Sequence, residues 1–346
     1  MQITEDILGR AVEKGILARE QAAELWKFLS TDSPATVASG PGFTFTNVLY
    51  YFGGVLAIGA MTLFMTLGWQ AFGGWGMFAI SGIYCAIALW GTRLLLGKGF
   101  PTPAGILAAL AIALVPLAIY GMENGLNMWP VDRPYRDYHY WVDWRWALME
   151  IGSLLAGTIV LYIFRTPFAV MPMAITLWYM SMDFAPLLAG GEAASETFRK
   201  LVSMVFGVAM LGVAVYIDVR TRRRPDFAFW LYLFGTLAFW GALSLMDSGS
   251  QLGRLLYALL NAVMIFIGAI LARRIFTVCG GIGVFGYLGY LSYSVFKDSI
   301  LFPFALTGLG LILVVTGIWW QRHEGEIRLR FRGHLPVGLR EALESA

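Results

Sequence analysis

Cysteine and histidine, from which most metal sites and many nucleophilic sites are built, are almost missing from this sequence. It has two cysteines and three histidines. Cys85 and Cys279 both fall in apolar stretches, which excludes a disulfide framework. His139, His323 and His334 are not spaced as metal ligands. We therefore expect no metal, no cofactor and no catalytic residue, and an enzyme is the least favoured class of function.

Charge is also scarce: 14% of the 346 residues are charged, whereas 58% are hydrophobic. A soluble protein of this length needs more polar surface. Several apolar runs of roughly 20 residues are long enough to cross a bilayer. The net charge of +3 gives no reason to expect a nucleic-acid partner. The composition predicts an all-α, polytopic bundle of transmembrane helices whose surroundings are membrane lipids.

The N-terminal part is the exception, because residues 1–30 read as a short soluble helical hairpin. Gly15 is placed to end its first helix. An apolar stripe follows on the second helix, at Ala22, Leu25, Trp26 and Leu29. Residues 3–29 could therefore bind a protein partner, and residues 31–43, rich in Ser, Thr, Pro and Gly, form a linker.

The long remainder, residues 44–320, is predicted to hold ten spans, followed by a tail at 321–346. The spans are about 44–68, 74–96, 102–121, 145–164, 167–188, 198–218, 227–246, 252–272, 276–295 and 300–320.

A basic cluster between two of these spans sets the predicted orientation. Residues 218–226 contain Arg220, Arg222, Arg223 and Arg224. Loops rich in lysine and arginine stay on the cytoplasmic side of a membrane. With this loop inside, both termini are cytoplasmic, and the four arginines are candidates for contacts with lipid headgroups.

Two segments suggest an internal repeat, because residues 49–63 align without gaps to residues 231–245. Spans in 44–164 and 227–320 would then be parallel repeats, with 167–218 inserted between them. The alternative is a chance alignment of two membrane helices rich in glycine and leucine.

A glycine motif at Gly281, Gly283 and Gly286 matches the dinucleotide-binding fingerprint as a string. It lies inside a predicted span with no preceding strand, so the context of that fingerprint is missing. Small residues on one face of a membrane helix let a neighbouring helix approach closely. We expect the motif to serve helix packing.

Acidic side chains inside apolar spans are the stronger clue to function, because each costs about 2.5–3.5 kcal/mol at the bilayer centre. Glu150 and Asp183 are the two candidates, and Asn47, Tyr179 and Asn261 are uncharged companions. One interpretation is a polar pocket in the outer half of the bundle, beside a helix broken by Pro167, Pro172 and Pro186. Pro167 and Pro186 could equally be terminal prolines, which would leave only Pro172 as a kink. The alternative is that the two acids lie near the interface and pair with Arg145, Lys200 or Arg254.

The longest predicted outer loop, residues 121–144, interleaves aromatic and charged residues, including Asp137, Tyr140, Trp141 and Asp143. Such residues can stack on and hydrogen-bond a polar ligand such as a sugar. Tyrosine and tryptophan are also enriched at membrane interfaces without any ligand. An interface belt or lid is the favoured interpretation.

A resemblance adds to the architecture. Gly15-Ile-Leu17, Gln21-Ala-Ala-Glu-Leu25, Phe52-Gly-Gly54 and Gly59 resemble uncharacterised bacterial membrane proteins of the domain-of-unknown-function 2157 type. That family has an Asn before the Trp closing its first span, where this chain has Leu67-Gly68-Trp69. The resemblance implies a cytoplasmic helical segment before many spans, in a bacterial inner membrane, and it implies no activity.

The sequence therefore favours a membrane protein that transports or binds a small solute, ion or lipid through an outward-facing polar pocket. The alternative is a non-transporting subunit or sensor that recruits a partner through its N-terminal cytoplasmic helices.

Overall fold

The structure is a computed structural model of the whole chain. It describes residues 18–31, 45–129, 144–188, 195–221, 226–246, 249–271 and 273–296, with single positions before residue 18 and between 303 and 318. Within these ranges the side chains of residues 26–31, 47, 55, 58, 61–71, 186, 187 and 295 are not described. The chain divides into two compact units, Met1–Val48 and Leu49–Ala346.

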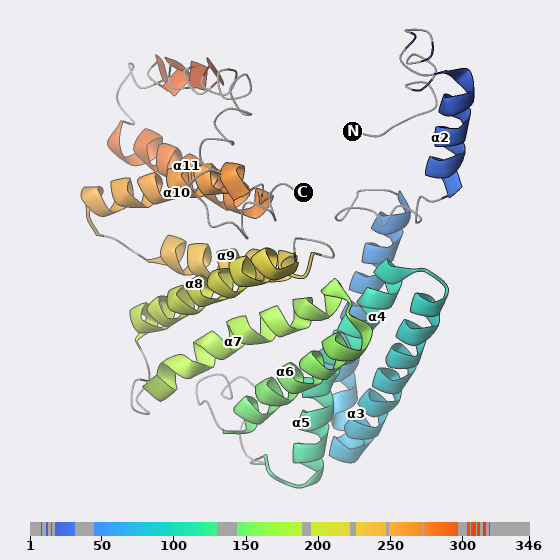
Figure 1. The fold of residues 1–346 in the computed structure, drawn as a ribbon. Coiled ribbons are helices and arrows are strands. Elements are labelled where there is room, and N and C mark those ends of the chain that lie inside the picture. The colour runs from blue at the N-terminus through green and yellow to red at the C-terminus, as the bar shows by residue number, and fades with distance from the viewer. Residues whose placement is uncertain are drawn as a thin grey trace. The chain divides into compact units, whose positions relative to one another are not determined.

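The described chain is all-helical, as predicted, and no strand occurs in these ranges (Figure 1). Its elements are α2 (Arg19–Thr31), α3 (Phe45–Gly97), α4 (Pro101–Ala113), α5 (Val115–Gly125), α6 (Trp144–Phe164), the 3-10 turn η2 (Pro167–Ala169), α7 (Val170–Leu188), α8 (Glu196–Thr221), α9 (Phe229–Leu245), α10 (Gln251–Leu271), α11 (Arg274–Tyr290) and the π-helical turn η3 (Leu291–Val295).

In the first unit, Gly15 ends a helical turn as the sequence predicts. Its φ is +69°, and its amide donates to the carbonyl of Val12 at 3.0 Å. The next helix, α2, begins after Ala18, whose amide donates to the side chain of Gln21. On α2 Ala22 is buried and Leu25 is exposed; the other two members of the apolar stripe lie outside the described side chains.

Seven helices of the second unit are long and apolar enough to cross a membrane by length and composition. They are Phe72–Gly97, Pro101–Gly125, Trp144–Phe164, Pro167–Ala185, Glu196–Thr221, Gln251–Leu271 and Arg274–Ser294. All seven coincide with predicted spans. The predicted span 227–246 is the shorter apolar helix Phe229–Leu245. Predicted span 44–68 is the first segment of α3, but it is not among the seven. Predicted span 300–320 lies largely outside the described residues, so the total of ten remains a prediction.

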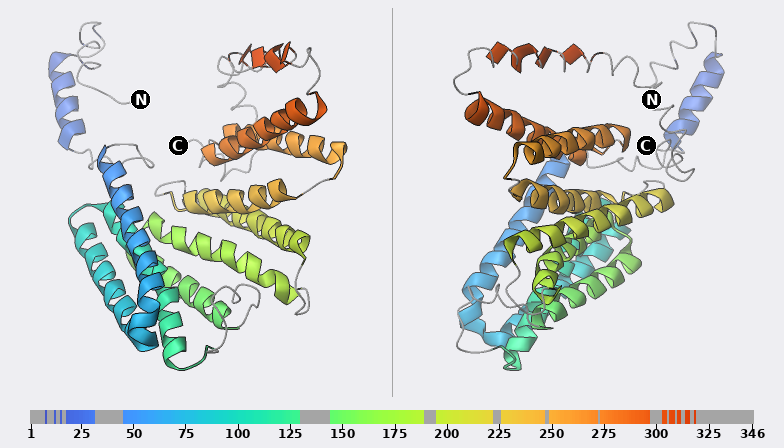
Figure 2. Two further views of the ribbon diagram at one scale, coloured as in Figure 1. Left: turned by 180° about the vertical axis from the view of Figure 1, so that it is seen from behind. Right: turned by 90° about the vertical axis from the view of Figure 1, so that its left-hand side faces the viewer.

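Gly73 interrupts α3, as the break between the first two predicted spans requires. Its backbone has φ +61° and ψ 178°, a conformation that only glycine adopts readily. The chain doubles back there, so α3 is two helical segments rather than one long rod (Figures 1 and 2).

One local prediction is wrong: Pro172 does not break the middle of its span. It lies in the first turn of α7, which then runs without interruption to Leu188. A proline is tolerated there because the first amides of a helix have no intrahelical acceptor. The irregular segment is at the start of the span, in η2.

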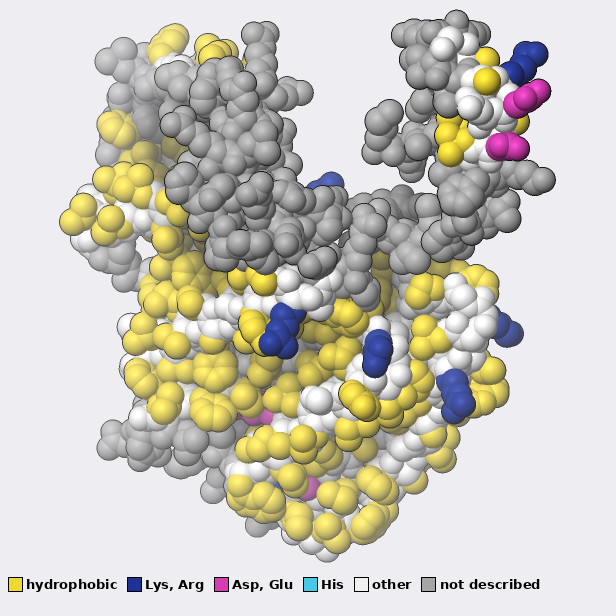
Figure 3. All heavy atoms as spheres, in the orientation of Figure 1, with side chains coloured by type: hydrophobic (Ala, Val, Ile, Leu, Met, Phe, Trp, Pro, Cys, Tyr) yellow, Lys and Arg dark blue, Asp and Glu magenta, His cyan; other side chains and the backbone are white. Residues whose placement is uncertain are grey.

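The surface of the bundle is dominated by hydrophobic side chains in the view of Figure 3. Large apolar residues such as Leu155, Ile163 and Phe285 are more than half exposed. Such extensive apolar exposure is unusual for a soluble monomer, and acyl chains would cover it in a bilayer.

Close approaches at glycine decide which helices pair. A Cβ added to Gly207 of α8 would lie 2.5 Å from the Phe239 amide and 2.8 Å from the Gly235 carbonyl of α9. A Cβ on Gly280 of α11 would lie 2.5 Å from the backbone oxygen of Asn261 of α10. Without a hydrophobic driving force between helices in lipid, such backbone contact supplies the packing.

The glycine motif is explained in part by the same packing. A Cβ on Gly283 would collide with the side chain of Asn261, so this position must be small. Gly281 and Gly286 have nothing within 4 Å and take no part in the contact.

A buried arginine links the two ends of the basic loop to the start of α11. Arg273 donates to Asp218 at 2.6 Å and to Asp226 at 2.6 and 3.1 Å. Its guanidinium also lies over the ring of Tyr232 at 4.7 Å. Burial by itself lowers the pKa of Arg273, but the hydrogen bonds that it donates to Asp226 and Asp218, and the negative charge of both, outweigh burial and raise that pKa overall. Arg273 therefore stays charged. We call these four residues the arginine clamp.

The described contacts also sort the loops into two ends. The arginine clamp places Asp218, Asp226 and the start of α11 at one end. Lys200, 18 residues before Asp218 on α8 and thus about 27 Å away along the helix, donates to the carbonyl of Leu245 at the end of α9. Residues that flank loops assigned by the sequence to the same side of the membrane are therefore in contact.

The glycine contact gives a first prediction. We expect Gly207→Ala to lower the unfolding free energy of the purified protein by about 1–3 kcal/mol, because backbone atoms of α9 must move. Gly212→Ala on the same helix is the control. Position 212 has nothing within 4 Å, so alanine there is neutral or stabilises by up to about 1 kcal/mol. Equal unfolding curves for the two variants would contradict the packing.

The arginine clamp gives a second prediction. We expect Arg273→Gln to cost about 3–5 kcal/mol of unfolding free energy, since it leaves buried carboxylates without their cation. Its exposed neighbour provides the control, and Arg274→Gln should change stability by less than about 0.5 kcal/mol. Adding Asp218→Asn to Arg273→Gln should recover part of the loss. Strictly additive losses in a double-mutant cycle would show that the pair is not coupled.

Candidate functional site

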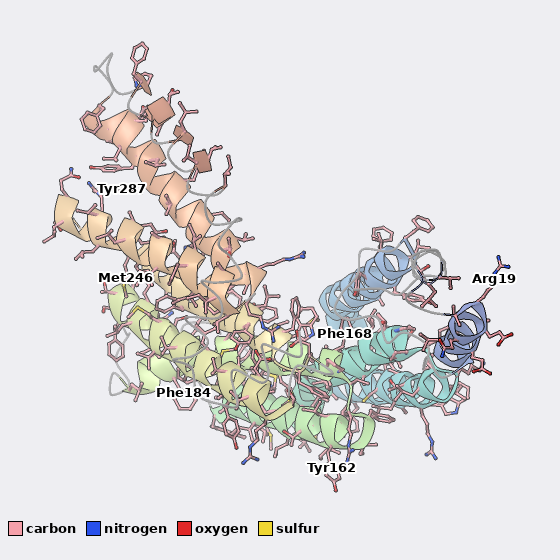
Figure 4. All side chains as sticks on the ribbon, turned by 45° about the horizontal axis from the view of Figure 1, so that its top comes forward. Arg19, Tyr162, Phe168, Phe184, Met246 and Tyr287 are labelled. Atoms are coloured by element: carbon pink, nitrogen blue, oxygen red, sulfur yellow. The ribbon has the colours of Figure 1, made fainter. Side chains whose placement is uncertain are left out.

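The two acids singled out in the sequence lie on neighbouring antiparallel helices. Glu150 is in the second turn of α6, and Asp183 is five residues before the end of α7. A short turn at Arg165 and Thr166 reverses the chain between the helices, with Arg165 at φ +50°. The beginning of α6 is thereby brought to the end of α7. In Figure 4, Phe184 marks this end of α7 and Tyr162 the opposite end of α6.

The Glu150 and Asp183 carboxyl groups are in direct contact through a side-chain hydrogen bond. Glu150 is 9% exposed, so water solvates it poorly. A hydrogen bond between two carboxyl groups requires a proton on at least one of them, and two like charges so close cannot both ionise without a large cost. The pair is therefore a place where the bundle holds a proton.

A cavity of about 310 Å³ adjoins this pair between α6 and α7. It is lined by Ala147, Glu150, Ile151, Leu154, Leu155, Thr158, Met180 and Phe184. The α6 members recur every three or four residues, so they form one face of that helix. The hydroxyl of Thr158 donates to the carbonyl of Leu154 at 2.8 Å, which occupies its proton within the helix. The cavity is therefore less polar than predicted, with Glu150 as its charged group.

The cavity faces outward from the bundle. Ile151 is 52% exposed and Leu155 is 61% exposed, although both line it. In a bilayer, this side of α6 would meet acyl chains. A ligand reaching Glu150 can therefore arrive laterally through an apolar opening.

The basic residues considered as alternative partners of these acids make other contacts. Lys200 forms an ion pair with Glu196 at 2.8 Å. Arg254 donates to the hydroxyl of Tyr290. The guanidinium of Arg145 lies over the rings of Trp129 and Trp144, at 5.5 and 5.8 Å.

The other predicted pocket residues are not gathered at the pair. Tyr179 is 60% exposed on α7, where its ring lies 6.5 Å from that of Trp178. Asn261 is fully buried in α10. Its side chain accepts from Trp240 at 2.9 Å and donates to the carbonyl of Tyr257 at 2.8 Å, so it joins α9 to α10. The side chain of Asn47 lies outside the described set.

Most of the predicted loop contacts also fall on residues that are not described. Asp137, Tyr140, Trp141 and Asp143 are among them, as are Arg222, Arg223 and Arg224. Arg220 is described and exposed, and its guanidinium lies 5.0 Å over the ring of Tyr216.

Sequence reasoning missed a third buried acid, Glu123. The predicted span ended at residue 121, which placed Glu123 in a loop, but α5 continues to Gly125 and buries the side chain completely. Its carboxylate accepts from the indole of Trp129 at 3.0 Å. The sequence does carry a signal for the end of α5, because glycine and asparagine are common just after a helix. Gly125 is the last helical residue, and Asn127 has φ +55°.

A metal site receives no support within the described part of the chain. No three His, Cys, Asp or Glu residues there are close enough together to hold an ion. Carboxyl groups, a proton and an apolar cavity are the chemistry that the site offers.

The carboxyl pair gives a third prediction. Dicyclohexylcarbodiimide is an apolar reagent that attacks protonated carboxyl groups. We expect it to label the Glu150–Asp183 pair of the protein in lipid nanodiscs at neutral pH, as mapped by peptide mass spectrometry. Glu150→Gln should remove most of the label, and exposed Glu196, beside Lys200, should remain unlabelled. Labelling of Glu196 but not of the pair would contradict a protonated pair beside an apolar cavity.

Comparison with known proteins adds no relative: no family model, no curated protein and no solved structure matches this chain. The resemblance to the domain-of-unknown-function 2157 type remains a prediction, and the function has to be argued from the site.

Proposed function

We propose that this chain is an integral membrane protein that binds, and carries between membrane sides, a small solute, ion or lipid at the Glu150–Asp183 pair. The observation that carries the proposal is the contact between these two carboxyl groups, where Glu150 lines a cavity on the outward face of α6 and α7. Ionisable residues inside membrane spans are costly and commonly mark substrate or ion pathways.

The carboxyl pair differs from the polar groups that only hold helices together. The buried side-chain amide of Asn261, for example, makes two hydrogen bonds within the protein. The acids at 150 and 183 instead contact one another beside an open cavity, where the proton between them can be replaced.

The orientation we propose places the pair toward the outside. With the arginine loop in the cytoplasm, the clamp is at the inner end of α8. Glu150 and Asp183 lie toward the other end of their helices, where α7 leads into α8. Both termini would then be cytoplasmic, and the membrane would be a bacterial inner membrane, as the resemblance implies.

A binding measurement tests this function. The protein is transferred from its own membrane into nanodiscs with its native lipids, and bound small molecules are detected by native mass spectrometry. We expect wild-type protein to retain a species whose occupancy falls about tenfold in Glu150→Gln and in Asp183→Asn, because both lose the charge that holds it.

Glu196→Gln is the control, since it removes an exposed carboxylate that the cavity does not use. It should retain the bound species at the wild-type level. If wild type and both pair variants carry the same species at the same occupancy, the pair is not a binding site and the proposal is wrong.

A further inference from the structure

We propose that the ligand of this cavity is an amphiphilic cation, one ammonium group on a compact apolar body, bound in exchange for one proton. This inference rests on the function proposed above and names the class of ligand. It follows from the charge of the pair, the lining of the cavity and its lateral opening.

The charge of the site selects a cation. When one of the two carboxyl groups is ionised, it attracts a cation, repels an anion and accepts hydrogen bonds. A hydrophobic wall disfavours net charge, so the empty pair is most stable with a proton on each carboxyl group. When a cation enters, one carboxyl group releases its proton to water and becomes the carboxylate that the ammonium group contacts. The other keeps its proton and the hydrogen bond, and both states are neutral.

The lining selects an apolar body. Six cavity residues, Ala147, Ile151, Leu154, Leu155, Met180 and Phe184, offer only hydrocarbon, thioether or ring surface. Burying apolar ligand surface there contributes about 25 cal/mol per Å². Phe184 is an aromatic lining residue of the same cavity, and an aromatic ring face attracts cations.

The same lining argues against a bare metal ion. Calcium and magnesium need six or more oxygen ligands, including water, and the lining provides the Glu150 carboxyl and a Thr158 hydroxyl already bonded to Leu154. A volume of about 310 Å³ is at the small end for organic ligands, which suits a single ring or a short chain.

The lateral opening fits the amphiphile. The exposed walls at Ile151 and Leu155 would let the apolar body enter from the acyl-chain region. Thr158 lies eight residues beyond Glu150 on α6, a distance of about 12 Å along the helix, so a chain held at Glu150 can run along this face.

A matched series of three probes tests the proposal: 2-phenylethylamine, 2-phenylethanol and 3-phenylpropanoate. They carry similar apolar bodies with a positive, a neutral and a negative head at neutral pH. Binding to the full-length protein in nanodiscs is measured by calorimetry, with protein-free nanodiscs subtracted. We expect the amine to bind at least tenfold more tightly than the alcohol, and the carboxylate not to bind.

The proton exchange has its own signature. Calorimetry in two buffers of different ionisation enthalpy should show release of one proton for each amine bound. Because the proton competes with the amine, the dissociation constant should rise about tenfold for each unit by which the pH falls. Glu150→Gln should abolish the preference for the amine over the alcohol, whereas Glu196→Gln should leave it unchanged.

Several outcomes would overturn the proposal: equal binding of amine and alcohol, tighter binding of the carboxylate, or amine binding without proton release. The charge series on wild-type protein decides the matter even if Glu150→Gln does not fold. If the amine fails while the native bound species still depends on Glu150 and Asp183, the class of ligand is wrong and the binding function stands. If that dependence also fails, the function itself is wrong.

Discussion

Close backbone contact at glycine is the constraint on which the arrangement of these helices depends. Apolar helices gain little from one another in lipid, because acyl chains are as apolar as leucine. Pairing therefore needs surfaces that fit. The crossings at Gly207 on Gly235 and at Gly280 on Asn261 supply them for α8–α9 and α10–α11. On the other side of the bundle, Gly74 and Gly121 let α3 and α5 approach in the same way.

The candidate site at Glu150 and Asp183 lies where two helices do not meet through close backbone contact at glycine. At Gly157 the α6 backbone leaves no room for a Cβ beside Met173 of α7. Seven residues earlier, the same two helices meet through the carboxyl groups of Glu150 and Asp183. At Gly157 a side chain of α7 fills the space beside the glycine, and the cavity opens toward the end where large side chains and acids replace glycine. A binding site is thereby built without a broken helix.

The sequence predicts where the helices lie along the chain, but it does not predict which helices pack against one another. Apolar runs located the helices and the break between residues 68 and 74, and glycine located the turn at Gly15, because these signals are local in the chain. Contacts such as Arg273 with Asp218, 55 residues apart, depend on which helices become neighbours, and one sequence does not show that. Nothing local in the sequence shows that the charge of Arg273 is used inside the fold.

The repeat shows the same limit. Gly235 and Gly53 occupy equivalent positions in the alignment, yet Gly235 packs against α8 whereas Gly53 has nothing within 4 Å. A shared residue can therefore serve packing in one segment and have no close neighbour in the other. The internal repeat stays a prediction, because identical residues at matching positions do not make the same contacts.

The arginine clamp and the carboxyl pair neutralise their acids in different ways, and the difference explains why one set is structural and the other is a candidate for function. In the arginine clamp, Asp218 and Asp226 receive a guanidinium that is tethered to the chain and keeps its charge at any physiological pH. At the carboxyl pair, the neutralising group is a proton, which leaves without disturbing the backbone. A tethered cation fixes helices together, whereas a proton can be exchanged for a ligand. The acids at 150 and 183 are thus where the chemistry of this fold can change with its surroundings.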